Sequence, residues 1–372
     1  MANARAYPLT SSPFYRLASK QKLAAILGVS LRDLRLLLKQ PDNYRLWDTR
    51  RRRRDELVGI PHKARAIQQP KPLLAIIHKR LAILIGRIEK PDYVYSATKA
   101  RSYFDNARPH AIGEPTVKID IKNFYSNVTR RFVRDFFERR LQCSPDVAHV
   151  LTELCCITTA SSSALPTGSA VSPVLSFFAC SEMFRRIAEI AKDHGLIFTL
   201  YVDDMVFSGS KANRHFTSKV VHELAKNGFV GHKITHFRGD ATKVVTGVAV
   251  SAGRVDLPFR RQRKIRQFEE AFWAATNPED ISLLGATLLG QYREAERIKP
   301  GTKLRALAVA ARLEKLGLSN GLPPSVKKRR GYPGKRLDAK RFDRLRSAVS
   351  LNPSTTSGGP ETLVNTGVVM AA

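Results

Sequence analysis

The stretch Leu196-Ile-Phe-Thr-Leu-Tyr-Val-Asp-Asp-Met-Val-Phe-Ser208 consists of two short apolar runs joined across two adjacent aspartates. The β-branched and aromatic residues of each run favour a β-strand, so the stretch predicts a hairpin with Asp203 and Asp204 at its bend. Asp is common in turns, and the pair alone is compatible with an ordinary hairpin turn. Two adjacent carboxylates also repel each other, which costs stability unless a cation lies between them.

A third carboxylate occupies a position where an acidic residue is unusual. Residues 116–121 read Thr-Val-Lys-Ile-Asp-Ile, a pattern that predicts an apolar strand, and Asp120 lies within it. Two strands that each place an aspartate at one sheet edge can hold two divalent ions ~4 Å apart, as phosphoryl transfer requires. Carboxylate oxygens suit Mg²⁺. Asp120, Asp203 and Asp204 are therefore the candidate catalytic residues.

The composition of the 372-residue chain indicates a polyanionic partner. Its 63 Lys and Arg residues exceed its 32 Asp and Glu residues, which gives a formal net charge of +31. Nucleic acid fits that charge best, because Lys and Arg gain affinity by releasing its condensed counterions. A membrane partner is not expected, since the sequence has no run of ~18 apolar residues. Residues 1–10 lack the apolar core of a secretory signal, so a cytoplasmic location is expected.

The four cysteines, Cys143, Cys155, Cys156 and Cys180, form no Cys-x-x-Cys pair, which argues against a zinc ribbon. In a reducing compartment such cysteines are expected to be buried as small hydrophobic side chains.

Three segments, in order along the chain, resemble the palm motifs of reverse transcriptases: Asp-Ile-Lys-Asn-Phe-Tyr at 120–125, Leu-Pro-Thr-Gly-Ser-Ala-Val-Ser-Pro at 165–173, and Tyr-Val-Asp-Asp at 201–204. The resemblance implies an α+β right-hand polymerase with fingers, an RRM-like antiparallel-sheet palm and an α-helical thumb. It also implies that Asp120 and Asp203 bind two Mg²⁺ ions, with Asp204 as the third carboxylate and the backbone carbonyl of Ile121 as an extra ligand. The implied substrates are dNTPs.

By the same resemblance, two parts of the palm are expected to contact the incoming nucleotide. Tyr125 stands where the family places a bulky ring that excludes a ribose 2′ hydroxyl; a core aromatic is the alternative. The loop Leu165–Gly168 resembles the loop beneath the nucleotide, with Thr167 and Gly168 as contacts. The family often has Gln at the position of Thr167, which leaves the polar contact there open.

Three basic residues are expected to approach the triphosphate. Lys63 and Arg65 lie in a predicted short strand that ends at Pro70, and they resemble fingers cations that clasp the triphosphate. Lys233 resembles the lysine of a later palm motif, which approaches the triphosphate as a general acid. The local sequence Val-Gly-His-Lys departs from the usual pattern, so a surface lysine is the alternative.

Two shorter elements narrow the resemblance to bacterial retron reverse transcriptases. Residues 106–110 read Asn-Ala-Arg-Pro-His, and residues 245–247 read Val-Thr-Gly. Both resemble retron signatures, as does the N-terminal region that contains Pro13-Phe-Tyr. The resemblance departs from many relatives at Tyr95-Ser-Ala, where those show His-Gly-Phe.

The retron resemblance implies that these two elements take part in RNA recognition, through Asn106, His110, Val245, Thr246 and Gly247. The alternatives are a pair of loop-bracing side chains in the first element and a strand that ends at a tight turn in the second.

The region 258–318 has a helical, basic pattern and supplies further candidate RNA contacts. Its arginines at three-residue spacing are expected to track a duplex or a folded RNA: Arg260, Arg263 and Arg266. Apolar residues that would pack on a neighbouring helix fall on another face: Ile265, Phe268 and Phe272.

The expected organisation of the chain is an N-terminal helical and basic region at 1–60, fingers with a retron-specific loop at 61–115, a palm with interleaved fingers helices at 116–257, an α-helical thumb at 258–320, and a basic, then disordered tail at 321–372. The five arginines of Arg50–Arg54 are either a solvated face or a phosphate contact. The tail is too short and polar for an effector domain.

The resemblance as a whole implies a retron reverse transcriptase that binds a cognate structured non-coding RNA and makes its DNA product. It implies priming from an internal guanosine 2′ hydroxyl, which gives branched RNA–DNA, and a role in anti-phage defence with a separate effector protein. Two alternatives stay open: another bacterial reverse transcriptase, of the intron type or an unbranched defence type, and a non-catalytic RNA-binding scaffold of a defence complex. The intact carboxylates argue against the scaffold.

Overall fold

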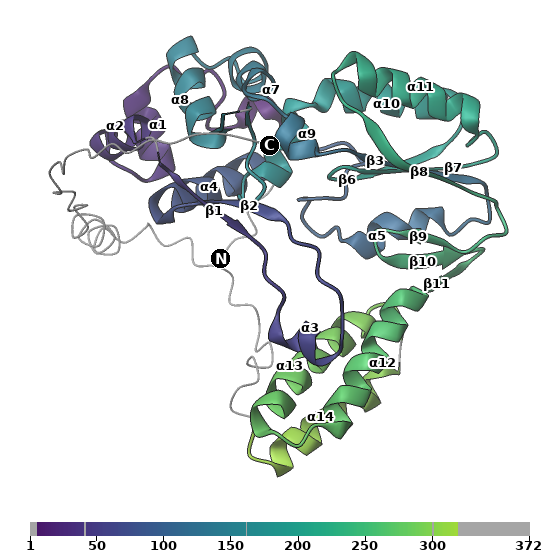
Figure 1. Ribbon diagram of the computed structural model, residues 1–372. Coiled ribbons are helices and arrows are strands. Elements are labelled where there is room, and N and C mark those ends of the chain that lie inside the picture. The colour runs from purple at the N-terminus through teal and green to yellow at the C-terminus, as the bar shows by residue number, and fades with distance from the viewer. Residues whose placement is uncertain (1–5, 41, 161, 300, 319–372) are drawn as a thin grey trace, which may run out of the picture. The chain divides into compact units, whose positions relative to one another are not determined.

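The computed structural model describes residues 6–40, 42–160, 162–299 and 301–318 (Figure 1). The predicted tail at 321–372 and the last two residues of the predicted thumb lie outside the described residues. Helices and strands alternate along the described chain, and they form the fingers, palm and thumb that the sequence predicts. No helix in these ranges is both long enough and apolar enough to cross a membrane.

The palm is a four-stranded antiparallel sheet in the order β6-β7-β3-β8 (Figure 1). Its strands are β3 (Thr116–Ile121), β6 (Ile197–Tyr201), β7 (Asp204–Ser208) and β8 (Gly231–Phe237). The first three are largely buried on both faces, which explains why their sequences are apolar runs without strict alternation. The faces are covered by α10 (Ser181–Asp193) and α11 (Arg214–Lys226) on one side, and by α5 (Tyr103–Ala107) and the 3₁₀ turn η2 (Arg108–His110) on the other.

Aromatic contacts join the palm sheet to its helices. Phe198 of β6 lies opposite Phe207 of β7, with ring centroids 4.7 Å apart. Phe207 also meets Phe216 of α11 at 4.9 Å. Such pairs contribute about 1 kcal/mol each beyond the burial of their area. The aromatic residues of β6 and β7 therefore stabilise the packing of the hairpin against α11.

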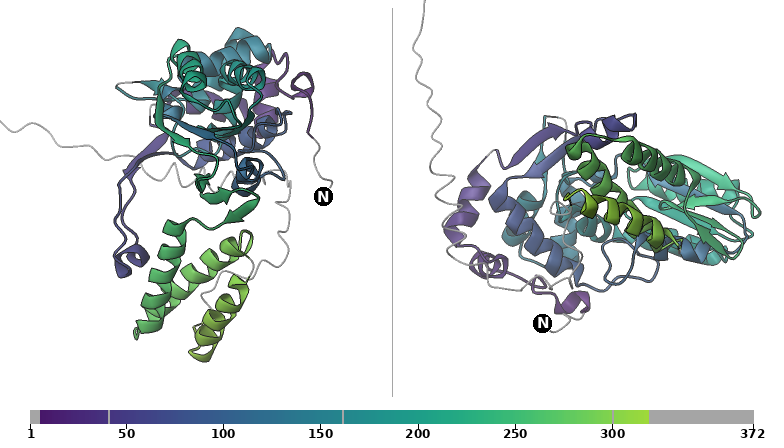
Figure 2. Two further views of the ribbon diagram at one scale, coloured as in Figure 1. Left: turned by 90° about the vertical axis from the view of Figure 1, so that its right-hand side faces the viewer. Right: turned by 90° about the horizontal axis from the view of Figure 1, so that it is seen from below.

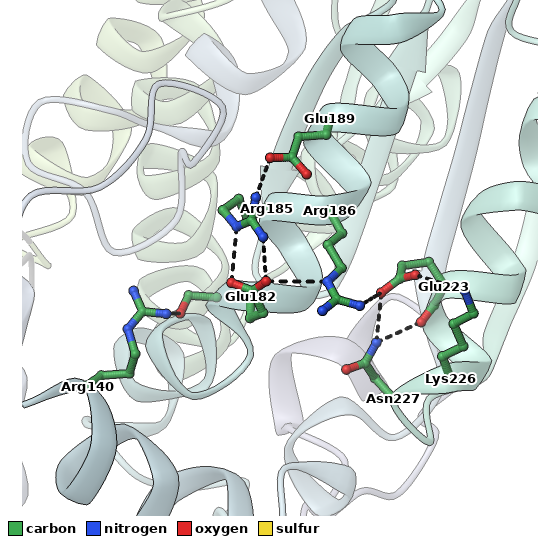
Figure 3. Close-up of polar contacts among 9 residues, drawn as sticks. Arg140, Glu182, Arg185, Arg186, Glu189, Glu223, Lys226 and Asn227 are labelled. Carbon is green, nitrogen blue, oxygen red and sulfur yellow. Dashed lines mark hydrogen bonds and ion pairs between the residues drawn. The ribbon is translucent and has the colours of Figure 1, made fainter.

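Ion pairs connect α10 with α11 on their outer surface (Figure 3). Glu182 accepts hydrogen bonds from Arg185 and Arg186, and Arg186 also lies 3.9 Å from Glu223 of α11. Because most of these side chains are exposed, each pair contributes only about 0–1 kcal/mol. These surface ion pairs therefore stabilise the contact between α10 and α11 less than the aromatic contacts of the core do.

The fingers consist of helices packed around α4 (Pro72–Gly86). These are α1 (Lys20–Leu27), α2 (Leu31–Lys39), α7 (Arg130–Asp135), the π-helical η3 (Phe136–Arg140), α8 (Pro145–Cys155) and α9 (Ser172–Ala179). Shorter elements complete the region: η1 (Leu9–Ser11), α6 (Phe124–Asn127), β4 (Ile157–Thr158) and β5 (Ser163–Ala164). The four cysteines are buried free thiols, as the sequence predicts.

A long hairpin extends from the fingers to the thumb (Figure 2). It pairs β1 (Tyr44–Asp48) with β2 (Ala66–Pro70), and its tip carries the short helix α3 (Arg53–Leu57). The predicted boundary between residues 60 and 61 falls inside this hairpin, because the two strands pair across it. Arg53, from the arginine run, pairs with Glu279 at 3.3 Å and Asp280 at 2.8 Å. The phosphate contact of the run stays a prediction.

A small sheet leads from the palm into a three-helix thumb. The sheet has the order β11-β10-β9 and contains β9 (Lys243–Val245), β10 (Val248–Ser251) and β11 (Arg254–Asp256). The thumb helices are α12 (Phe259–Ala274), α13 (Pro278–Glu296) and α14 (Thr302–Lys315). Phe268, Phe272 and Tyr292 are buried in the thumb core, so the apolar face predicted for the first helix packs on its neighbours.

Candidate active site

One end of the palm sheet brings the three predicted carboxylates to a common edge. β3 and β7 pair so that Asp120 lies opposite Asp204, and Asp204 faces Tyr201 across the hairpin. The backbone N–H of Ile121 donates to the carbonyl of Asp203 at 3.1 Å. Motifs that are far apart in the sequence therefore meet where the sequence predicts.

The turn that carries Asp203 is held by a residue that sequence reasoning did not single out. Val202 has a φ of 63°, a left-handed conformation that a β-branched residue rarely adopts. The N–H of Val202 donates to Oγ of Ser96 at 2.9 Å, and Ser96 is only 4% exposed. Ser96 lies in the loop where the sequence departs from many relatives, so this polar substitution is the signal that points to its role.

The carboxylates are partly buried and repel one another. Burial raises the pKa of Asp203 to about 6, and the charges of Asp120 and Asp204 add to the rise. Burial also raises the pKa of Asp204, and its Oδ1 is buried with no hydrogen-bond partner among the described residues. Crowded carboxylates with an unsatisfied oxygen fit a divalent cation, which would screen their repulsion.

Protein cations neutralise part of this charge. The Nζ of Lys118 lies 3.0 Å from Oδ2 of Asp204. Asp120 has two cationic neighbours from β8, since its Oδ1 lies 2.9 Å from Nδ1 of His232 and its Oδ2 lies 3.6 Å from Nζ of Lys233. Lys233 therefore lies at the catalytic edge beside a carboxylate, and its approach to the triphosphate stays a prediction.

Within the part of the chain that the structure describes, no three acidic, histidine or cysteine side chains gather into a preformed metal site. Both oxygens of Asp120 and Oδ2 of Asp204 lie beside protein cations. The metal-ligand set, including the carbonyl of Ile121, therefore stays a prediction. Sequence reasoning did not single out Lys118 or His232; Lys118 lies two residues before Asp120, and that spacing places both on one face of the strand.

Tyr125 lies beside the catalytic hairpin. Burial, together with the neighbouring Asp203 and Tyr201, raises the pKa of Tyr125. Its half-buried ring also packs near that of Phe124, with the centroids 6.0 Å apart. Tyr125 is thus partly a core aromatic, and its role as a gate stays a prediction.

The loop Leu165–Gly168 packs against strand β2 of the fingers. Oγ1 of Thr167 donates to the carbonyl of Ala66 at 3.1 Å, and the N–H of Gly168 donates to the carbonyl of Gln68 at 3.2 Å. A Cβ on Gly168 would lie 2.8 Å from that carbonyl oxygen, so a glycine is needed for this close approach. The nucleotide contacts of Thr167 and Gly168 stay predictions.

Lys63 and Arg65 are exposed and come just before β2. The carbonyl of Arg65 accepts a hydrogen bond from the N–H of Thr49 at 2.9 Å, so the hairpin pairing extends to this residue. The two cations are therefore carried on the same hairpin that supports the loop Leu165–Gly168.

The two retron-like elements contact each other. Nδ2 of Asn106 donates to Oγ1 of Thr246 at 3.4 Å, and that hydroxyl donates to the carbonyl of Tyr103 at 2.7 Å. Thr246 has a φ of 44°, and Gly247, which follows it, has a φ of 82° and is exposed. The Val-Thr-Gly element is therefore a strand end with a tight turn that docks on the first element.

His110 has no exposed surface, and both of its ring nitrogens have hydrogen-bond partners. Its Nδ1 lies 2.7 Å from Oγ of Ser208, and its Nε2 lies 2.8 Å from Oγ1 of Thr199. Asn106 and Val245 are also fully buried. A side chain with no exposed surface cannot offer a contact to RNA. The burial therefore favours the bracing alternative for Asn106 and His110, and the strand-end alternative for Val245, the last residue of β9.

The first thumb helix separates basic from apolar residues as predicted. The arginines are exposed: Arg260, Arg263 and Arg266. The apolar residues are buried: Ile265, Phe268 and Phe272.

Comparison with known proteins finds retron reverse transcriptases, although no protein-family model matches the chain. The Retron Ec86 reverse transcriptase of Escherichia coli is 27% identical over 244 residues, which cover 64% of this chain and 73% of that protein. The Retron Se72 reverse transcriptase of Salmonella heidelberg is 26% identical over 67% of this chain and 66% of its own length. Among solved structures, a foamy viral protease-reverse transcriptase in complex with double-stranded DNA aligns with 73% of this chain and 39% of its own, at 14% identity and a TM-score of 0.39.

The sequence relatives and the ordered palm motifs define the chain as a reverse transcriptase, an RNA-directed DNA polymerase. Within that class it is similar to the retron type, with four retron reverse transcriptases at 23–27% identity. The matches span 73% and 66% of the two relatives above and 50% of the Retron Ec48 reverse transcriptase of Escherichia coli.

Proposed function

We propose that this chain copies a cognate structured non-coding RNA into DNA. Synthesis starts from the 2′ hydroxyl of an internal guanosine, gives branched RNA–DNA, and serves anti-phage defence with a separate effector protein. The observation that carries the polymerase part is the common edge of Asp120, Asp203 and Asp204. The retron part is supported by the relatives and by the contact between Asn106 and Thr246, which joins the two retron-like elements.

In this proposal Asp120, Asp203 and Asp204 hold two Mg²⁺ ions, and the carbonyl of Ile121 adds a ligand. The unsatisfied Oδ1 of Asp204 supports a cation at this edge, and hard carboxylate oxygens suit Mg²⁺. When bound, the ions would lower the pKa of the attacking hydroxyl and screen the charge of the triphosphate.

The proposed nucleotide-binding residues are Lys63, Arg65, Tyr125, Thr167, Gly168 and Lys233, of which Tyr125 and Lys233 lie beside the catalytic carboxylates. The half-buried ring of Tyr125 beside Asp203 suits the exclusion of a ribose 2′ hydroxyl. The side chain of Lys233 is 68% exposed and can therefore turn from Asp120 toward a triphosphate. The loop Leu165–Gly168 would support the nucleotide from below, and its bonds to β2 couple it to the fingers cations.

RNA binding in this proposal rests on the exposed Arg260, Arg263, Arg266 and Gly247, together with the partly buried Thr246. The arginines lie on one exposed face of α12, and the formal net charge of +31 favours a polyanion. Asn106, His110 and Val245 would act indirectly, because they are fully buried. Asn106 donates to Thr246 in the turn, and His110 contacts Ser208 and Thr199 of the palm sheet.

The test is DNA synthesis by the purified chain on the structured RNA encoded beside its gene, with Mg²⁺ and dNTPs. We expect DNA joined to the RNA through a 2′–5′ bond, released by a debranching enzyme, and absent with Asp203→Asn. DNA synthesis without a branch would favour an intron-type or unbranched reverse transcriptase.

The scaffold alternative is separated by the double variant Asp203→Asn, Asp204→Asn. It is expected to bind the RNA with native affinity, since the exposed arginines are unchanged, and to make no DNA. Phage protection that persists in cells carrying this variant would show that polymerisation is dispensable and would favour a scaffold.

A further inference from the structure

The strand β8 places a histidine directly opposite the first catalytic aspartate. Asp120 pairs with His232 in the β3–β8 register, and Nδ1 of His232 lies 2.9 Å from Oδ1 of Asp120. A carboxylate can only accept hydrogen bonds, so Nδ1 carries the hydrogen in this contact. Directly opposite residues of an antiparallel pair lie on the same face of the sheet, which explains why the two side chains meet.

A bulge in β8 creates this contact. Lys118 pairs with Thr235, whereas Asp120 pairs with His232, so two steps along β3 correspond to three along β8. Without the extra residue, Lys233 would lie opposite Asp120. The bulge contains Lys233 at a φ of 49°, a left-handed conformation. Bulges occur next to active sites, where they redirect a side chain.

The two cations of β8 hold Asp120 in different ways. His232 contacts Oδ1 with a short, planar side chain that is 37% exposed, whereas Lys233 approaches Oδ2 at 3.6 Å with a side chain that is 68% exposed. A lysine side chain has more rotamers and loses more entropy when it is held in place. His232 is therefore the rigid partner of Asp120, and Lys233 is the mobile one.

We propose that His232 is a positioning residue for the metal ligand Asp120. Its Nδ1–H group fixes the carboxylate through Oδ1 and leaves Oδ2 for a divalent ion, once Lys233 has turned away. This inference rests on the proposed metal-dependent function. Loss of a partner that orients a metal ligand typically lowers metal affinity by 10- to 100-fold.

The test is Mn²⁺ binding to the full chain, without RNA or dNTPs, followed by the electron paramagnetic resonance signal of free Mn²⁺. His232→Asn places an N–H donor at the same distance along the side chain as Nδ1, whereas His232→Gln places it one bond further out. We expect His232→Gln to weaken Mn²⁺ binding about 10- to 100-fold and His232→Asn to keep an affinity close to that of the native chain.

Lys233→Gln is the matched control, because it removes a neighbouring cation but leaves the Nδ1 hydrogen bond. It is expected to bind Mn²⁺ at least as tightly as the native chain, since a like charge near the site opposes a cation. Equal affinity of His232→Gln and native chain, or equal weakening by Asn and Gln, would overturn the proposal. Circular dichroism of each variant checks that this edge-strand position tolerates the change.

The assay separates this inference from the proposed function. A native chain that binds Mn²⁺ but makes no DNA would sink the proposed function and leave the His232 result standing. A native chain that makes DNA, together with a His232→Gln variant of unchanged Mn²⁺ affinity, would sink only the positioning role.

Discussion

The two ends of the β3–β7 pair differ in how their polar groups are satisfied. At one end Asp120 faces Asp204, and Oδ1 of Asp204 is buried without a hydrogen-bond partner. At the other end Thr116 faces Ser208, and their hydroxyls lie 2.7 Å apart. The same two strands therefore have one end where carboxylates repel each other and one end where the hydroxyl groups are hydrogen-bonded.

The hydroxyl end belongs to a buried network that includes a retron-like element. Oγ of Ser208 also meets Nδ1 of His110 at 2.7 Å, and Nζ of Lys243 donates to Oγ1 of Thr116 at 3.0 Å. His110, Lys243, Thr116 and Ser208 are all fully buried. The comparison teaches that the end with the proposed catalytic carboxylates holds charges that repel one another, whereas the polar groups of the other end satisfy one another.

The largest expected effect separates the two roles. Asp203→Asn should reduce DNA synthesis at least ~10³-fold, equivalent to about 4 kcal/mol of transition-state stabilisation. Its free energy of unfolding without metal should be equal to or above that of the native chain, because one of three repelling carboxylates is gone. Single-turnover extension and urea unfolding measure the two quantities. A clear loss of stability would contradict the assignment of this end to function.

The second expected effect is a loss of folding stability at low pH, caused by two buried histidine rings. Burial lowers the pKa of His78 to about 4 and, with help from Lys243, the pKa of His110 to about 3. In the unfolded chain both rings are protonated below about pH 6.5. The stability from these neutral rings is therefore complete above that pH and is lost as the pH falls toward about 4, by up to about 1.4 kcal/mol per pH unit for each ring.

Urea midpoints between pH 7 and pH 5 measure this slope. His110→Asn should lower it by the share of one ring, up to about 1.4 kcal/mol per pH unit, whereas substitution of the exposed His215 by Asn should leave it unchanged. A slope that is unchanged in His110→Asn would mean that the hydroxyl end does not depend on a neutral ring.

The third effect tests the hydroxyl end by removing its ammonium group. Lys243→Met keeps the volume of the side chain but leaves Thr116 and the carbonyl of Glu114 without that donor. The expected loss is about 2 kcal/mol in the free energy of unfolding, with native DNA synthesis per folded molecule. Lys211→Met changes the net charge equally at an exposed position, and it should lose almost nothing. A catalytic defect in Lys243→Met without a loss of stability would contradict the assignment of the hydroxyl end to stability.

The smallest expected change in the free energy of unfolding comes from an ion pair at the surface. Arg53 and its partner Glu279 have side chains that are 55% and 78% exposed. Arg53→Ala should therefore cost at most about 1 kcal/mol, and the cost should shrink further in 0.5 M salt. If the loss equalled that of Lys243→Met, burial would not be what distinguishes the hydroxyl network.

Much of the palm could be predicted from local patterns. The strands around Asp120 and the hairpin at Asp203 are short apolar runs, so their type and their order along the chain were readable without a structure. The separation of arginines and apolar residues on α12 follows from helical periodicity and is confirmed. Domain edges were less readable, since the pairing of β1 with β2 joins residues on both sides of the predicted boundary.

The sequence alone therefore determined the chemistry of this protein: the identity of the carboxylates, the strands that carry them and the retron-type resemblance. Only the tertiary structure decided which groups surround those carboxylates. A bulge selects His232 over Lys233 opposite Asp120, Ser96 reaches the turn from a distant loop, and His110 and Lys243 become buried together. Periodicity is a local property of the chain, whereas register and burial depend on segments that meet only after folding, and so no local pattern could specify them.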